Sequence, residues 1–169
     1  MLGTVPAAIA GWTDWRSRRI PNWLTVSGLV IGLGVSGWAG GWAGARASVL
    51  GAGLGLAILL PFVLVRALGA GDWKLAGSIG AFLGPQRLLA ALFVAVLVAG
   101  VMAIGLVIWK RRVGQTARNV GRIVLAYFML RLPDPELSLD NPEAIKVPFG
   151  VAMAVGVILY SASQVWGMS

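Results

Sequence analysis

The chain of 169 residues contains no cysteine and no histidine. These absences exclude disulfides, thiolate nucleophiles, serine–histidine and cysteine–histidine catalytic pairs, and most zinc sites. Charged residues are also scarce at 12%, against about 25% in ordinary soluble domains, while apolar residues make up 58%. With a mean hydropathy of +0.84, the composition predicts an integral membrane protein.

Acidic residues are the rarest charges, and their distribution is uneven. Four of the six fall in one short segment: Asp134, Glu136, Asp140 and Glu143. Only Asp14 and Asp72 stand alone within apolar sequence, so they are the first candidates for a functional role. The net charge of +8 is more typical of topology signals facing an anionic leaflet than of nucleic-acid binding, so we expect no nucleic-acid partner.

Stretches without charge predict where the chain crosses the bilayer. They cover residues 1–13, 20–45, 47–65, 75–86, 88–109 and 147–169. Four of them are long enough to span a hydrocarbon core of about 30 Å, and the short first and fourth fit a thinned or water-filled part of a bundle. We therefore expect an all-α integral membrane fold, a six-transmembrane-helix bundle that forms a single domain over residues 1–169.

The basic residues predict the orientation of this bundle. An outside N-terminus, an uncleaved first helix and alternating crossings put twelve of the fourteen basic residues on one side, and only Arg46 and Arg87 on the other. The positive-inside rule makes the first side cytoplasmic. Asp14 and Asp72 then both lie at cytoplasmic ends of their spans in a multi-pass protein of the cytoplasmic membrane.

Glycine, with 24 residues, is unusually frequent and often regularly spaced. Four pairs have the spacing Gly-x-x-x-Gly: Gly28 and Gly32, Gly37 and Gly41, Gly51 and Gly55, and Gly80 and Gly84. Such spacing lets helix backbones approach closely in lipid. We expect these pairs to pack helices inside the bundle rather than to form a dimer face, and the oligomeric state stays open.

The segment 110–147 is the only long polar connection. Its first part carries polar residues on one helical face, Arg111, Gln115, Arg118 and Arg122, and apolar residues on another. This pattern is typical of a cytoplasmic amphipathic helix lying in the membrane interface. Prolines then punctuate the acidic segment, which predicts a solvated cytoplasmic loop.

Each lone aspartate has a structural explanation as well as a chemical one. Asp14 could pair with Arg18 one turn later, and Asp72 could cap the helix that follows Gly69-Ala70-Gly71. Together, however, two carboxylates on one membrane face can share a proton and act as general base and general acid in peptide hydrolysis. This chemistry requires no histidine, cysteine, metal or organic cofactor.

Three segments resemble the type IV prepilin peptidases, membrane aspartyl proteases of the Gly-x-Gly-Asp type. Residues 14–22 read Asp-Trp-Arg-Ser-Arg-Arg-Ile-Pro-Asn, like the segment of the family's first aspartate. Residues 69–75 read Gly-Ala-Gly-Asp-Trp-Lys-Leu, and residues 147–150 read Val-Pro-Phe-Gly, similar to the family's second and closing motifs. Their order across about 150 residues makes the resemblance specific.

The resemblance implies that the protein cleaves the basic leader from a prepilin or preflagellin-like precursor, just after a glycine, at the cytoplasmic face. It implies Asp14 and Asp72 as catalytic residues. It also assigns substrate-binding or supporting roles to the remaining motif positions, Gly69, Gly71, Lys74, Pro148, Phe149 and Gly150. The longer members carry a cysteine-rich segment and methylate the new N-terminus. This chain has no cysteine and no such segment, so it resembles the short form of the family, and methylation is not expected.

Three alternatives remain at this point. Ser78 follows Lys74 by four residues, which would suit a serine/lysine protease, although a small serine among glycines more often packs helices. A proton-coupled transporter also carries acids at membrane depth, but we would expect them near span centres. A non-catalytic structural subunit would tolerate replacement of both aspartates.

Overall fold

The computed structural model describes residues 4–17, 21–64, 67–111 and 147–166, with positions 114, 116, 118, 119, 121 and 122 in addition. The helices within the four main ranges are α1 (Thr4–Ser17), α2 (Asn22–Leu64), α3 (Ala70–Trp109) and α5 (Phe149–Trp166). The described residues contain no strand, which confirms the expected all-α fold. Most of the segment 110–147, with its predicted interfacial helix and acidic loop, lies outside them.

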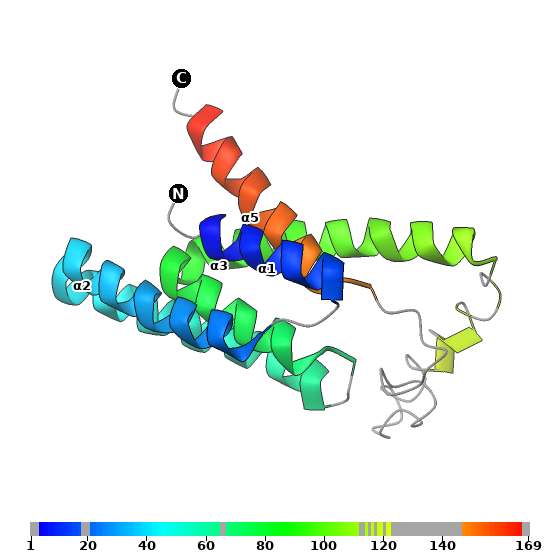
Figure 1. Ribbon diagram of the computed structural model, residues 1–169, viewed down its shortest axis with the longest axis horizontal. Coiled ribbons are helices and arrows are strands. Elements are labelled where there is room, and N and C mark those ends of the chain that lie inside the picture. Colours follow the sequence, from blue (N-terminus) through cyan, green and yellow to red (C-terminus); the bar gives the residue numbers. More distant parts are fainter. Residues whose placement is uncertain are drawn as a thin grey trace.

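Helix α2 reverses direction at Gly41, which has a positive φ of 56°. A β-carbon on Gly37 would lie 3.7 Å from that of Ala45, and one on Gly44 would meet the carbonyl oxygen of Ser36. In a straight helix, residues eight apart would be separated by about 12 Å. The two halves therefore run back along each other (Figure 1).

Helix α3 is interrupted in the same way at Gly84, whose φ is 72°, just before Pro85. Proline lacks an amide hydrogen, so the carbonyl of Ala81, four residues earlier, loses its helical donor. The hydroxyls of Ser36 and Ser48 donate to that carbonyl instead, at 3.1 and 2.6 Å. One serine from each half of α2 thus supplies a hydrogen bond to the carbonyl that the break in α3 leaves without its helical donor.

The positions of these breaks differ from the span boundaries expected from the charges, which lay at Arg46 and Arg87. Both arginines are exposed and lie inside helical segments. Only glycine adopts a positive φ without a steric cost, so the chain reverses at Gly41 and Gly84. An exposed arginine does not by itself end a helix.

Small residues hold α2 against α3, as the glycine spacing predicts. A β-carbon on Gly51 would meet the Gly80 carbonyl, and one on Gly55 would lie 2.6 Å from the Ala76 carbonyl. Gly28 faces the Ser78 side chain in the same interface. These contacts confirm packing within the bundle, since larger side chains would force the helices apart.

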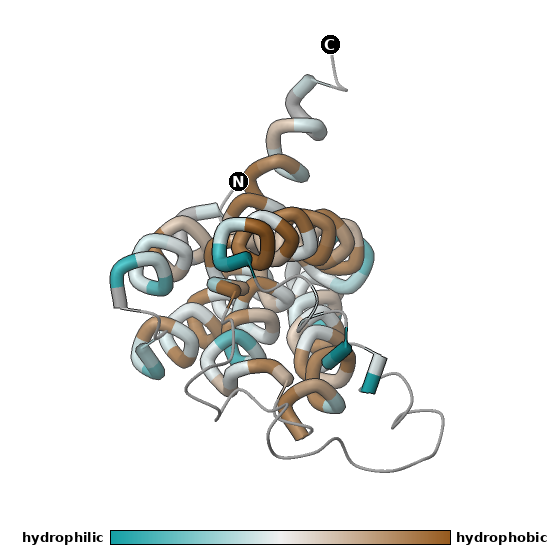
Figure 2. The backbone as a smooth tube through the Cα atoms, turned by 90° about the vertical axis from the view of Figure 1, so that its right-hand side faces the viewer, coloured by the Kyte–Doolittle hydropathy of each residue, from teal (hydrophilic) through white to brown (hydrophobic). Residues whose placement is uncertain are grey.

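The outer surface of the bundle is apolar. Large side chains such as Val30, Phe93 and Val101 are 62%, 67% and 71% exposed. Figure 2 shows hydrophobic residues along much of the helical bundle, including its periphery. An apolar exterior of this kind suits contact with lipid rather than with water.

By length and hydropathy, two of the described helices could cross a membrane, α2 and α3, rather than the six separate spans expected from the sequence. The difference arises because each long helix contains two of the expected spans, joined at a single glycine without a loop. The apolar composition and these two helices identify a helical membrane protein.

Helix α5 joins α1 to α3. A β-carbon on Gly11 of α1 would lie 2.7 Å from the Ala154 β-carbon of α5. On another face of α5, a β-carbon on Gly156 would lie 2.7 Å from the Ala91 carbonyl oxygen of α3. The end of α1 and the starts of α3 and α5 consequently lie toward one end of the bundle (Figure 1). Both lone aspartates belong to this end.

Candidate active site

Asp14 lies in the last turn of α1 and is buried, with 6% of its surface exposed. It packs against the first turn of α5. A β-carbon on Gly150 would lie 2.9 Å from Asp14 Oδ2 and 3.0 Å from Asp14 Cβ. Gly150, the last residue of the Pro-Phe-Gly motif, therefore leaves the space that the carboxylate occupies, and two segments far apart in sequence form one contact.

Asp72 lies in the first turn of α3, three residues after the N-cap residue Gly69. The backbone amide of Gly69 donates a hydrogen bond to the Asp72 carboxylate. This is one half of a capping box, in which the side chain at the third helical position accepts the amide hydrogen of the N-cap. The helix thus starts before Asp72 rather than after it, with Gly69 as the N-cap residue, and the bond to the Gly69 amide fixes the direction of the Asp72 side chain.

The two aspartates lie close enough for their negative charges to interact. Asp14 is buried, and Asp72 is half-buried. Charges in such surroundings interact more strongly than in water, because little solvent screens them. The fold thus brings together the two carboxylates that stand alone in the sequence.

Lys74 links the two motif segments. Its Nζ donates a hydrogen bond to Asn22 Oδ1 at 3.0 Å, which ties the first turn of α3 to the first residue of α2. Asn22 closes the Ile-Pro-Asn part of the first motif, so the bond fixes the segments of both aspartates relative to each other.

Ser78, the nucleophile of the serine/lysine alternative, lies one turn further along α3. Its Oγ is buried and finds no hydrogen-bond partner among the described residues. It faces Gly28 in the helix interface. Since the Ser78 hydroxyl receives no hydrogen bond from Lys74, the geometry favours a packing role over a serine/lysine pair.

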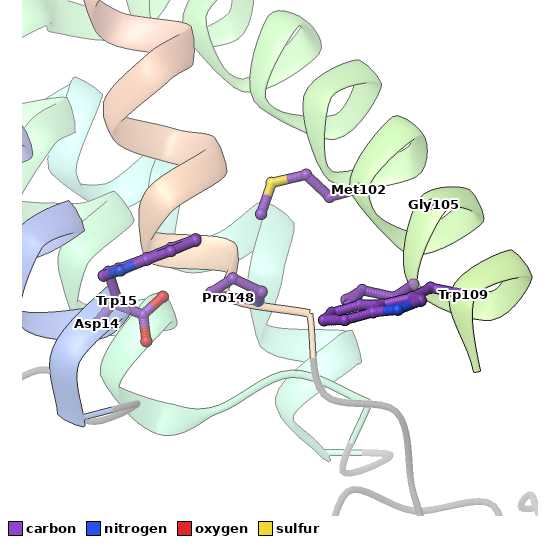
Figure 3. Close-up of a pocket in the computed structure, with 7 residues that line it drawn as sticks. Asp14, Trp15, Met102, Gly105, Trp109 and Pro148 are labelled. Atoms are coloured by element: carbon purple, nitrogen blue, oxygen red, sulfur yellow. The ribbon is translucent and has the colours of Figure 1, made fainter.

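A cavity of about 390 Å³ opens beside Asp14. Its lining comes from three elements: Asp14 and Trp15 of α1, Pro148 before α5, and Met102, Gly105, Leu106 and Trp109 of α3. Figure 3 shows Asp14 and Trp15 on one side, Trp109 on the other and Pro148 between them. Of the lining residues that the structure describes, Asp14 alone is charged, so this carboxylate faces a largely apolar surface.

Phe149, next to Pro148, faces a second cavity of about 450 Å³. Phe62, Leu68 and Phe93 also line that cavity, and its lining is apolar throughout the described residues. The three residues of the Pro-Phe-Gly motif thus face different surroundings. Pro148 lines the cavity beside Asp14, Phe149 lines the second cavity, and Gly150 contacts Asp14. The motif separates the two spaces at the start of α5.

The remaining candidates are placed only partly. Gly71 is half-buried in the first turn of α3. Arg18, the expected partner of Asp14, and the acidic segment with Asp134, Glu136, Asp140 and Glu143 lie outside the described residues. In the part of the chain that the structure describes, no three histidine, cysteine, aspartate or glutamate side chains gather to hold a metal ion.

Sequence reasoning missed Gly11 and the cavity residues Met102, Gly105 and Trp109 as parts of the site, and it placed Asn22 in the first motif without a partner. The spacing of residues 102, 105 and 109 places them on one helical face, but nothing in the sequence marks that face as different from a lipid-facing one.

Comparison with known protein families gives one match. The model of the type IV leader peptidase family matches residues 1–104, which include Asp14 and Asp72 but not the Pro-Phe-Gly segment. No curated protein and no solved structure matches the chain. Because the match covers more than half of the 169 residues, the chain belongs to the type IV leader peptidase family and is a membrane peptidase of the prepilin type.

Proposed function

We propose that the protein is an aspartic endopeptidase that removes the basic leader of a type IV pilin-like or preflagellin-like precursor. Asp14 and Asp72 form its catalytic pair. The observation that carries this proposal is the burial of Asp14 beside Asp72, at the end of the bundle where α1, α3 and α5 meet. Family membership supports the peptidase activity and the class of substrate.

In the proposed reaction, the two carboxylates share one proton. The ionised member removes a proton from water, whose oxygen adds to the carbonyl carbon of the scissile peptide bond. The protonated member donates to the carbonyl oxygen and, when the intermediate collapses, a proton passes to the leaving nitrogen. The products are a carboxylic acid on the leader and a free amine on the mature protein.

The other motif residues act on this pair rather than on the reacting atoms. Gly69 directs the Asp72 carboxylate through its amide, and Gly150 leaves room for Asp14. Lys74 holds the segments together through Asn22. We assign Gly71 to the close approach of the substrate backbone, and Pro148 and Phe149 to the walls of the two cavities.

The membrane arrangement that fits this function has six crossings, with the N-terminus outside and the active site facing the cytoplasm. The reversals at Gly41 and Gly84 support it, since each divides a long apolar helix into two. The positive-inside count supports a cytoplasmic position of the aspartate end in this arrangement. A cytoplasmic leader then reaches the catalytic pair without crossing the bilayer.

The activity is tested with the full chain, purified and reconstituted in lipid vesicles. The substrate is a peptide with a short basic leader that ends in glycine, followed by an apolar segment. We expect mass spectrometry to show one cut, directly after the glycine. A matched peptide with leucine in place of that glycine should be cut much more slowly. An intact glycine peptide after incubation with the folded protein would contradict the proposal.

A further inference from the structure

The cavity beside Asp14 continues along α3 as an apolar groove. Its α3 wall consists of Met102, Gly105, Leu106 and Trp109, which recur on one face of the helix. Neighbouring residues on other faces, such as Ile104 and Ile108, are 62% and 61% exposed. This last part of α3 extends beyond the other helices (Figure 1).

Gly105 lies in the middle of the groove wall. A β-carbon built there would have no atom within 4 Å. Most buried glycines of this protein, by contrast, lie in tight helix contacts. The space at Gly105 is therefore available to a side chain from another molecule, with Met102 and Trp109 one turn away on either side.

The charges around the groove indicate whether the basic leader of a substrate or the apolar segment after it fits there. Among the described residues of the lining, Asp14 supplies the only charge. The described residues that follow the two tryptophans are basic: Arg16 after Trp15, and Lys110 with Arg111 after Trp109. These basic residues would repel a basic leader at this place. Apolar side chains, in contrast, suit the apolar lining, where a charged or polar group would lose its hydrogen bonds with water.

We propose that this groove binds the apolar residues of the substrate that follow the cleaved bond, with one of their side chains seated against Gly105. The inference rests on the proposed peptidase function, because it places the scissile bond next to the Asp14 carboxylate at the groove's end. Gly105 is then a specificity-determining residue, since its missing side chain sets the size that the groove accepts. Side chains at helical spacing on an apolar segment fit such a groove.

The first test replaces the glycine with a larger residue. Gly105→Leu fills the groove and should raise the KM of the leader peptide about tenfold or more, with a much smaller change in kcat. Gly100→Leu is the matched control. Gly100 is also an exposed glycine of α3 with no atom within 4 Å of its missing β-carbon, but it is not part of the groove lining. An equal KM for both variants would overturn the proposal.

The second test does not depend on cleavage. A photoreactive side chain in the apolar segment of the same peptide should cross-link to the part of α3 that contains residues 102–109, and an unlabelled apolar peptide should compete. Cross-linking at the second cavity, near Phe62 and Phe93, would overturn the groove assignment even if the peptide is cut. The proposal would also be overturned if a lipid or a second copy of the chain occupied the groove and the peptide did not displace it. An uncut peptide that still cross-links to residues 102–109 would contradict the catalytic proposal alone.

Discussion

Asp14→Asn and Asp72→Asn should each lower the kcat for leader cleavage by about 10³-fold or more. Asparagine keeps the size and the hydrogen-bonding capacity of aspartate, but it cannot take up and release a proton. In the Asp72→Asn variant, the side-chain carbonyl oxygen can still accept the amide hydrogen of Gly69, so the first turn of α3 keeps its cap. We therefore expect the thermal unfolding temperature of both variants to stay near that of the wild type.

The same assay separates the aspartyl mechanism from the serine/lysine alternative. Ser78→Ala should cleave at close to the wild-type rate, because the hydroxyl is buried against Gly28 and receives no hydrogen bond from Lys74. Wild-type kcat in either asparagine variant would refute the aspartate pair. Loss of cleavage in Ser78→Ala alone, with unchanged unfolding, would instead support a serine nucleophile.

Gly150→Ala should lower kcat by about 10²-fold with little change in KM. The new β-carbon would lie 2.9 Å from Asp14 Oδ2 and 3.1 Å from Asp14 Cγ, so the carboxylate has to move. A displaced carboxylate is no longer aligned for proton transfer, which lowers kcat. The groove lined by Met102 and Trp109 stays open, so KM changes little. Steady-state kinetics of the purified variant, together with its unfolding temperature, measure the effect.

Gly11→Ala provides the control for this variant. Its new β-carbon would lie 2.7 Å from the Ala154 β-carbon, so it crowds the same α1–α5 interface without meeting the Asp14 carboxylate. We expect both variants to lose stability, but only Gly150→Ala to lose kcat. Equal losses of kcat in the two variants would mean that Gly150 acts through helix packing alone.

Several features of this site could be predicted from sequence because they leave local signals. Asp14 and Asp72 are conspicuous as lone carboxylates in apolar surroundings, where an acid is costly to keep. The bias of the basic residues predicts that both lie toward one end of the bundle. Glycine spacing predicts close helix contacts, and Gly28, Gly51 and Gly80 make them. Each of these signals depends on residue type and position along the chain.

Other features depend on contacts between distant segments and leave no such signal. The charges at Arg46 and Arg87 suggested loops, yet a long basic side chain can reach the surface from within a helix, and the chain reverses at Gly41 and Gly84 instead. Proline is no better guide, because α2 continues through Pro61. The bond between Lys74 and Asn22 joins residues 52 positions apart.

The account depends most on the claim that Asp14 and Asp72 lie in one site, and cysteine cross-linking in membranes measures this directly. The native chain has no cysteine, so the only thiols are those introduced. Asp14→Cys combined with Asp72→Cys should be joined by a short bifunctional thiol-reactive reagent. Asp14→Cys combined with Gly40→Cys should not, because Gly40 adjoins Gly41, where α2 reverses at the opposite end of the bundle (Figure 1). Failure of the first pair to cross-link in folded protein, or equal cross-linking of both pairs, would contradict the account.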